Sequence, residues 1–326
     1  MDYKSEIINY CNSLGLDAVG VTECRRFDEL EKYFTVRKLK GYENEFEEQD
    51  IEKRINPNIY MEEGKAIISI AFPYVYNLDY GKDIYFSKYT LGNDYHTVVS
   101  AYLQKICGFI ESLGGMAKYF VDSNTLPERY IASLAGVGFR GKNNMIITEK
   151  YGSYVFLGEI ITNLDLQKDN GIECKCGDCN LCLKACPTSS IRKDSCNSNV
   201  CLSYITQKKD IDDVWINKLK GRIFGCDACQ DVCPYNKKIS FSNIKEFTPY
   251  NFMENINVNE LIRLDNKTFK EKYKLTSCGW RGKNILTRNA LINAMSLGMI
   301  LDIDEKEFSS PYIRQYYSRL LSIYKL

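Results

Sequence analysis

Four cysteines near the middle of the chain are spaced as ligands of an iron–sulfur cluster. The segment 176–187 reads C-G-D-C-N-L-C-L-K-A-C-P, so Cys176, Cys179, Cys182 and Cys186 are separated by two, two and three residues, and a proline follows the last. Thiolates with this spacing and a trailing proline are typical of ferredoxin-type [4Fe–4S] cubes. The segment therefore predicts an electron-transfer site.

A second, shorter run of cysteines repeats the end of this pattern. Cys226, Cys229, Cys233 and Pro234 lack a counterpart of the first cysteine, and Cys201 is the candidate for that position. In two-cluster ferredoxins the last cysteine of each run ligates the other cluster. We therefore expect one cube to be bound by Cys176, Cys179, Cys182 and Cys233, and the other by Cys186, Cys201, Cys226 and Cys229.

Structural zinc is the alternative for paired cysteines. Zinc also accepts C-x2-C pairs, but four ligands satisfy it, and it has no use for a third cysteine in each run or for the trailing proline. Cys174 and Cys196 flank the expected ligands and are the alternatives to them. The remaining four cysteines are expected to be small buried residues: Cys11, Cys24, Cys107 and Cys278.

The composition is that of a folded protein of two or three modules. With 326 residues, of which 44% are apolar, the chain can bury one large core and a smaller second one. It has no apolar run of about 18 residues and no signal-peptide zones at its start. We therefore expect a cytoplasmic protein whose clustered cysteines bind metal. A net charge of +1 means that any nucleic-acid footprint must be a local basic patch.

Helical and strand patterns alternate before the cysteines, and helical patterns follow them. Apolar periodicity predicts helices over 3–14, 94–113 and 125–135, the last with a capping box that begins at Thr125. Short apolar runs predict strands over 17–21, 66–72, 117–121, 144–148 and 154–161. Further helices are expected over 252–273, 285–299 and 312–324. This order predicts an α/β (α+β) module over 1–169, a ferredoxin-like insert over 170–240 and a short helical region over 241–326.

Residues 136–142 match two nucleotide-binding motifs without the setting that either requires. The segment G-V-G-F-R-G-K satisfies both G-x-G-x-x-G and G-x4-G-K. Both motifs need a strand before the glycines and a helix after them, because the phosphate rests on the helix N-terminus. Here a helix precedes and a strand follows, and Asn143 stands where a P-loop needs Ser or Thr. We therefore reject nucleotide binding; the segment is a tight turn or a backbone nest beside another ligand.

Several sequence blocks occur together in a consistent order over most of residues 1–240. They are Y-T-L-G-N-D-Y-H at 89–96, V-D-S-N-T-L-P-E-R at 121–129, A-G-V-G-F-R-G-K-N at 135–143, G-S-Y-V-F-L-G-E at 152–159 and the two cysteine runs. In these blocks the chain resembles the epoxyqueuosine reductases, which are cobalamin and iron–sulfur enzymes of queuosine synthesis on tRNA. Residues 281–290 also resemble the start of a HEAT-like helical region in that family, which is abbreviated here.

The resemblance implies a reaction, its cofactors and its proton donor. The epoxide of epoxyqueuosine at tRNA position 34 would lose its oxygen to give queuosine, with cobalamin and two [4Fe–4S] clusters as cofactors. By the family motif Asp122 is the acid, and burial against a corrin face would help it to retain its proton near neutral pH. Without the resemblance, Asp122 would be an ordinary turn aspartate, and His96, the single histidine, a packing residue.

The resemblance also implies a corrin lining and a tRNA surface. Besides Asp122, the residues that fall where the family lines its corrin are Arg54, Ile146, Ser153, Leu157, Ser203, Gln207 and Asp227. Without the resemblance, Arg54 would be interpreted as a surface charge, and Ser203 and Gln207 as residues on the surface of a helix. The candidate phosphate contacts, which would otherwise form a solvated face, are Lys208, Lys209, Lys218, Lys220, Arg222, Arg281, Lys283 and Arg288.

Two other functions are compatible with the cysteine runs. A two-cluster electron carrier needs no α/β module ahead of its clusters, so the length of the chain disfavours it. A corrinoid reductive dehalogenase combines the same cofactors, but the block around Asp122 and the lack of an export signal favour the reductase. Its expected partners are the modified tRNA and an external low-potential electron donor. We expect no membrane association and a monomer.

Overall fold

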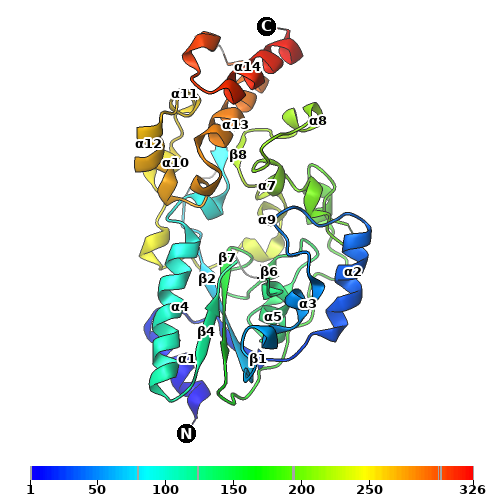
Figure 1. Ribbon diagram of the computed structural model, residues 1–326, viewed down its shortest axis with the longest axis vertical. Coiled ribbons are helices and arrows are strands. Elements are labelled where there is room, and N and C mark those ends of the chain that lie inside the picture. The colour runs from blue at the N-terminus through cyan, green and yellow to red at the C-terminus, as the bar shows by residue number, and fades with distance from the viewer. Residues whose placement is uncertain are drawn as a thin grey trace. The chain divides into compact units, whose positions relative to one another are not determined.

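The computed structural model describes residues 2–78, 81–122, 125–192, 195–299, 301 and 303–325, and it divides the chain into two compact units (Figure 1). The first unit comprises Met1–Tyr76, Tyr95–Asn199 and Ala228–Glu246, and the second comprises Asn77–Asp94, Val200–Asp227 and Phe247–Leu326. The chain therefore passes back and forth between the units, and the cysteine-rich segment is shared between them. The division into three consecutive modules stays a prediction.

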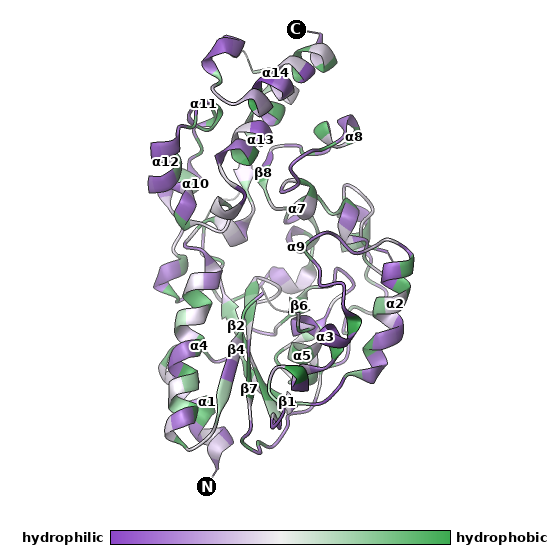
Figure 2. Ribbon diagram, viewed as in Figure 1, coloured by the Kyte–Doolittle hydropathy of each residue, from purple (hydrophilic) through white to green (hydrophobic). Residues whose placement is uncertain are grey.

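A four-stranded antiparallel sheet organises the first unit. Its strand order is β1(Val19–Glu23), β2(Ala66–Pro73), β7(Val155–Thr162) and β4(Ala117–Phe120). Every residue of β2 is buried, and β2 and β7 are green along most of their length in Figure 2. The expected mixed α/β class is confirmed. Because the strands are antiparallel, however, the rule that places ligands at the carboxyl ends of parallel strands does not apply.

Helices cover both faces of this sheet. On one face, α1(Tyr3–Ser13) packs on α4(Tyr95–Ser112), which contacts β4 and β7. A Cβ placed at Gly158 of β7 would lie 2.8 Å from Leu103 of α4, so the glycine permits this close packing. The other face is covered by α5(Glu128–Leu134), which contacts β1, β2 and β7. Side chains alternate along β7, so Glu159 lies on the α5 face.

The ladder between β4 and β7 ends early. β2 pairs with all of β7, whereas β4 pairs only with Glu159–Thr162. In the part of the chain that the structure describes, residues 155–158 of β7 therefore have a strand on one side only. After Phe120 the chain leaves the sheet, and Asp122 adopts φ +37°, a left-handed conformation that is uncommon outside glycine. The two residues that follow, Ser123 and Asn124, lie outside the described residues.

Short elements complete the first unit. They are α2(Glu31–Leu39), α3(Ile51–Ile55), the antiparallel pair β5(Phe139–Arg140) and β6(Ile146–Ile147), α6(Leu181–Ala185) and α9(Ala228–Asp231). The glycine segment follows α5, contains β5 and precedes β6, so the inverted order, with the helix before the glycines and a strand after them, is confirmed. The predicted capping box is wrong: α5 begins after Pro127 without a side-chain cap among the described residues, and the Thr125 hydroxyl bonds to Lys53 O at 3.1 Å instead.

The second unit is mainly helical. It contains a parallel pair, β3(Tyr85–Phe86) and β8(Arg222–Phe224), with α7(Leu202–Ile205), α8(Asp213–Ile216), α10(Asn251–Glu254), α11(Val258–Ile262), α12(Asn266–Glu271), α13(Lys283–Ser296) and α14(Pro311–Tyr324). The single helix predicted over 252–273 is wrong. The side chains of Asn257 and Asp265 accept backbone N–H groups and start new helices within that stretch.

Helix α13 supports this unit with buried polar side chains. Asn289 Nδ2 donates to the carbonyl oxygens of Ile223 (2.7 Å) and Thr206 (2.8 Å). Asn293 donates to Arg222 O at 2.9 Å and accepts the N–H of Gly221 at 2.6 Å. These amides supply partners for backbone groups around β8, which pairs with only one strand among the described residues.

The substitution Asn289→Ala should destabilise the second unit. It leaves the carbonyl of Ile223 without this partner and removes the Oδ1 atom that accepts from the Arg288 guanidinium at 2.8 Å. Because buried unpaired polar groups cost about 1–3 kcal/mol each, we expect the free energy of unfolding to fall by roughly 2–4 kcal/mol in urea titrations. The control is Ser318→Ala, whose exposed hydroxyl donates to Arg314 O within α14. Equal losses in the two variants would contradict the account.

Candidate active site

The first unit brings together the four thiols expected to hold cluster one. Cys179 N–H donates to Cys176 O at 3.0 Å, Cys182 lies on α6, and Cys233 follows α9, which packs on α6. Cys233 is buried with Phe139 and Ile147 of the β5–β6 pair, and Cys176 packs against the same small cluster. The β5–β6 hairpin, whose first strand lies within the glycine segment, thus forms a wall of this thiol site.

Electrostatic effects among these thiols also show that they lie close together. Burial raises the pKa of Cys176 to about 11, with further contributions from a hydrogen bond with Cys174 and from the charges of Cys174 and Cys182. Burial is also the main cause of the raised pKa of Cys182, on which Cys179 and Cys233 act in the same direction. Four acidic ligands held in this proximity favour a group that binds them as thiolates.

Lys142 fastens the loop that carries the first cysteines. Its Nζ donates to the carbonyl oxygens of Gly177 (2.7 Å) and Cys179 (3.0 Å) and to Asn180 Oδ1 at 3.2 Å. The next residue, Asn143, is buried, and its Nδ2 has no hydrogen-bond partner among the described residues. Lys142, which belongs to the G-x4-G-K match that we rejected as a P-loop, therefore positions the cysteine loop. The buried amide of Asn143 follows it in the chain.

The thiols expected to hold cluster two belong to both units. Cys186 and Cys229 lie in the first unit, and Cys201 and Cys226 in the second. Burial acts to raise the pKa of Cys186, but the backbone N–H groups of Thr188, Ile191 and Ser190 outweigh it and lower that pKa overall. N–H groups directed at a sulfur are typical of cluster ligands. The ligand set of cluster two stays a prediction.

The remaining cysteines fall into two groups. Cys11, Cys24, Cys107 and Cys278 are buried, as expected. Cys174 is exposed and forms a hydrogen bond with Cys176, and Cys196 is partly buried and lies near enough to Cys182 and Cys186 for their charges to act on it. Cys196 therefore remains the alternative to Cys201 as a cluster ligand.

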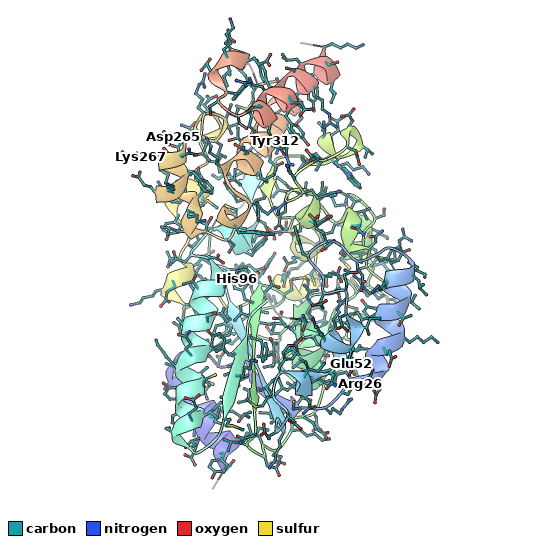
Figure 3. The ribbon with its side chains drawn as sticks, in the orientation of Figure 1. Arg26, Glu52, His96, Asp265, Lys267 and Tyr312 are labelled. Carbon is teal, nitrogen blue, oxygen red and sulfur yellow. The ribbon has the colours of Figure 1, made fainter. Side chains whose placement is uncertain are left out.

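Asp122 lies among aromatic side chains of the first unit. The Tyr95 hydroxyl donates to Asp122 Oδ2, and His96 Nε2 lies 3.8 Å from the same oxygen. Figure 3 shows His96 at the start of α4. The Tyr95 ring stacks on the ring of Phe156, with 4.3 Å between the ring centres. Phe156 lies in the half of β7 that β4 does not cover. His96 thus lies beside the predicted acid rather than in the core, which the sequence did not indicate.

Two more carboxyl groups accompany Asp122. Glu128, the first residue of α5, accepts the N–H of Asp122 at 2.6 Å. Glu159 on β7 is fully buried; its Oε1 accepts from Ser69 Oγ at 3.3 Å, and its Oε2 has no partner among the described residues. Burial raises the pKa of Glu159 well above its ordinary value, and Glu128 and Asp122 add to this effect. A glutamate in an otherwise apolar strand is the sequence signal that we overlooked.

Several of the predicted corrin contacts of the first unit already have partners. Arg54 forms ion pairs with Glu43 (2.6 Å) and Glu47 (3.2 Å), and its guanidinium lies 3.8 Å from the Phe34 ring centre. The Ser153 hydroxyl donates to Gln230 Oε1 at 2.9 Å. Ile146 lies in β6, and Leu157 lies in the uncovered half of β7.

The predicted corrin contacts of the second unit lie on α7 and beside β8. Asp227 is buried and accepts from Ser87 Oγ (2.6 Å) and Lys88 N–H (2.8 Å). Ser203 and Gln207 are half-buried, and the Gln207 amide donates to Ser203 O at 2.8 Å. Their contact with a corrin stays a prediction.

Two of the predicted phosphate contacts are wrong because their guanidinium groups are buried. Arg288 donates to the carbonyl oxygens of Thr206 and Lys209, and Arg222 donates to Leu219 O at 3.0 Å and to Cys226 Sγ at 3.2 Å. Of the remaining candidates, Lys209 and Lys220 are exposed, and Lys208, Lys218, Arg281 and Lys283 are half-buried. These six residues stay the predicted phosphate contacts.

Comparisons with known proteins identify the family of this site. Residues 54–123 match the family model "Epoxyqueuosine reductase QueG, DUF1730", and residues 175–236 match the model "4Fe-4S double cluster binding domain". The epoxyqueuosine reductase of Bacillus anthracis is 37% identical over 300 residues, which cover 89% of this chain and 79% of that protein. The chain belongs to the epoxyqueuosine reductase family.

Solved structures of epoxyqueuosine reductase support this assignment. A crystal structure of epoxyqueuosine reductase with an epoxyqueuosine-modified tRNA-Tyr stem loop has a TM-score of 0.92 at 34% identity, covering 98% of this chain and 90% of that one. A structure of the Bacillus subtilis enzyme, with an aspartate catalytic loop swung out of its active site, has a TM-score of 0.90 at 34% identity and the same coverage.

Two general features of this epoxyqueuosine reductase complete the description. None of the helices that the structure describes combines the length and hydropathy that a membrane span requires. Within the same residues, no three His, Cys, Asp or Glu side chains are arranged to hold a single metal ion. The thiolates of a cube each bind a different iron atom, so a cube requires a wider arrangement of its ligands.

The substitution Glu159→Gln should make the stability of this reductase less dependent on pH. Because burial raises the folded-state pKa above the ordinary value of 4.5, the contribution of Glu159 is full below that pH and is lost as pH rises toward the folded-state pKa. Glutamine has no proton to lose. The variant should therefore gain up to about 1.4 kcal/mol over wild type per pH unit within that window.

Urea unfolding from about pH 4.5 to about pH 8 measures this difference. The exposed Glu63 offers the matched control, Glu63→Gln. A Glu159→Gln difference that stays constant with pH would show that the buried group is already ionised.

Proposed function

We propose that this chain reduces epoxyqueuosine at tRNA position 34 to queuosine, using bound cobalamin and two [4Fe–4S] clusters. Family membership supports the reductase activity, and the modified stem loop in the related crystal structure supports the substrate. The observation that carries the proposal in this chain is the carboxyl of Asp122, held by Tyr95 beside the uncovered half of β7. We place the reaction in the cytoplasm, with electrons from an external low-potential donor to a monomeric enzyme.

The thiols fit two clusters. Cys176, Cys179, Cys182 and Cys233 lie together in the first unit and would hold cluster one. Cys186, Cys201, Cys226 and Cys229 would hold cluster two, as the spacing within the matched double-cluster domain suggests. The Arg222 guanidinium at Cys226 Sγ would favour the reduced, more negative state of that cluster.

The first unit also has groups that fit a corrin. A corrin carries peripheral amides, which need donors and acceptors at the wall that binds them. Asn143 Nδ2 is a buried donor without a partner among the described residues, and the backbone around Leu157 lies in the strand segment that β4 leaves uncovered. These groups, with Ile146, would hold cobalamin, whereas Arg54 and Ser153 would act by shaping the wall. Ser203, Gln207 and Asp227 are the proposed contacts from the second unit.

Cobalamin, when bound, supplies low-valent cobalt that provides electrons for the deoxygenation. The protein must then bind the epoxide, exclude water and deliver protons to its oxygen. Asp122 would donate the first proton, with Tyr95 and His96 fixing the carboxyl by contacts to Oδ2. The catalytic aspartate loop of the Bacillus subtilis enzyme supports an aspartate in this role.

The basic residues of the second unit are the proposed tRNA surface. Lys209 and Lys220 are exposed, and Lys208, Lys218, Arg281 and Lys283 add half-buried charges. Such residues bind phosphate by releasing counterions, so their contribution should weaken with added salt. They would orient the anticodon loop rather than take part in the chemistry.

The substitution Asp122→Asn tests the proposed acid. Asparagine keeps the size of the side chain but cannot donate a carboxylic proton, so the single-turnover rate should fall by about a hundredfold or more. Chemically reduced, cofactor-loaded enzyme would convert epoxyqueuosine tRNA, and nucleoside mass spectrometry would follow the product. Cobalamin and iron content are the controls and should equal those of wild type. Wild-type rates in the fully loaded variant would exclude Asp122 as the proton donor.

The substitution Cys201→Ser tests the ligand set of cluster two. We expect about eight iron atoms per wild-type chain, and about half of them in this variant, with the EPR signal of one cluster retained. Cys196→Ser is the matched control, because its thiol also lies near expected ligands. Loss of a cluster in Cys196→Ser, with both kept in Cys201→Ser, would assign the ligand to Cys196 instead.

A further inference from the structure

Glu159 is a buried carboxyl group that the proposed reaction does not yet use. It lies on β7 opposite Ser69 of β2 and Phe120 of β4, two residues before Asp122. The residue is fully buried, and its Oε2 has no hydrogen-bond partner among the described residues. An ionised carboxylate would be costly at such a position, so the group is held in its protonated form.

The charged groups that face Glu159 are also carboxyl groups. Glu128 at the start of α5 acts on it most strongly, followed by Asp122 after β4, while the facing residue of β2 is the neutral Ser69. Glu128 also accepts the N–H of Asp122. We call Asp122, Glu128 and Glu159 the carboxyl cluster. Two of its members therefore lie close enough to Glu159 to oppose its ionisation.

The stoichiometry of the reaction requires more than one proton. Converting an epoxide into an alkene breaks two C–O bonds, consumes two electrons and two protons, and releases the oxygen as water. The reductant supplies the electrons. Asp122 holds one carboxylic proton at most, so by itself it can supply only one of the two. A donor at this position therefore needs a nearby source from which it can be reloaded.

We propose that Glu159 is a positioning residue that stores a proton and returns it to Asp122 by way of Glu128. In the first transfer the Asp122 O–H bond breaks and an O–H bond forms on the epoxide oxygen. Glu159 then loses its proton as Asp122 regains one, the second transfer from Asp122 completes water, and two protons from solvent reload Asp122 and Glu159. This inference rests on the proposed role of Asp122 as the donor.

The test compares pH profiles of single-turnover rates in loaded, chemically reduced wild type and Glu159→Gln. Glutamine preserves shape but stores no proton, so Asp122 must be reloaded from solvent. We expect near-wild-type rates at about pH 5, where protons are abundant, and a loss of about tenfold or more at about pH 8. The exposed Glu63→Gln variant should follow wild type at every pH. A loss that is equal at all pH values, or no loss, would overturn the proposal.

Two further measurements keep the outcome decisive. Infrared difference spectra should show a protonated carboxyl in wild type near pH 7 that Glu159→Gln lacks. If that variant does not fold, a wild-type rate that already declines above about pH 5, as for an ordinary carboxylic acid, would overturn the proposal. Asp122→Asn is measured in parallel. Wild-type rates in Asp122→Asn would exclude Asp122 as the donor. A reduced rate in Asp122→Asn, together with a wild-type pH profile in Glu159→Gln, would exclude only the storage role of Glu159.

Discussion

The early end of the β4–β7 ladder is the constraint on which the candidate active site depends. β4 has four residues and stops at Phe120, so among the described residues the first half of β7 pairs with β2 alone. The chain then turns through the left-handed conformation of Asp122, which brings its carboxyl to Tyr95, and Tyr95 stacks on the uncovered Phe156. A longer β4 would cover this edge and fix Asp122 within a ladder. Backbone strain at a functional residue is maintained by such surroundings.

Both units use polar side chains to supply partners for backbone carbonyl oxygens of irregular segments. In the first unit Lys142 holds the cysteine loop by its carbonyl oxygens. In the second unit Asn289, Asn293 and Arg288 do the same for β8 and the residues after α7. Loops that carry ligands have little regular structure, and such bonds fix them at the cost of desolvating a polar side chain. Rigid placement of the loops is the result.

Sequence reasoning succeeded where a motif is local. The cysteine spacing indicated the thiol site, and apolar periodicity located β2, β7, α4 and α14 to within a few residues. It failed where burial decides the role. Arg288 and Arg222 are of a residue type that commonly binds phosphate, but contacts with other parts of the chain bury them. Glu159 and Glu128 could not be placed beside Asp122, because their proximity depends on the β4–β7 register and on the position of α5.

The interleaving of the two units has a consequence for how the protein is made. The first unit needs residues 228–246, which supply α9 and Cys233, yet these are translated after the first part of the second unit. A ribosome releases the chain from its N-terminus, so the sheet can form while its cysteine loop still lacks a fourth thiol. With Cys233 as the proposed fourth ligand, insertion of cluster one would wait until that later segment has emerged. A nascent chain paused before that point would expose three thiols to oxidation, so the timing of translation bears on the yield of intact protein.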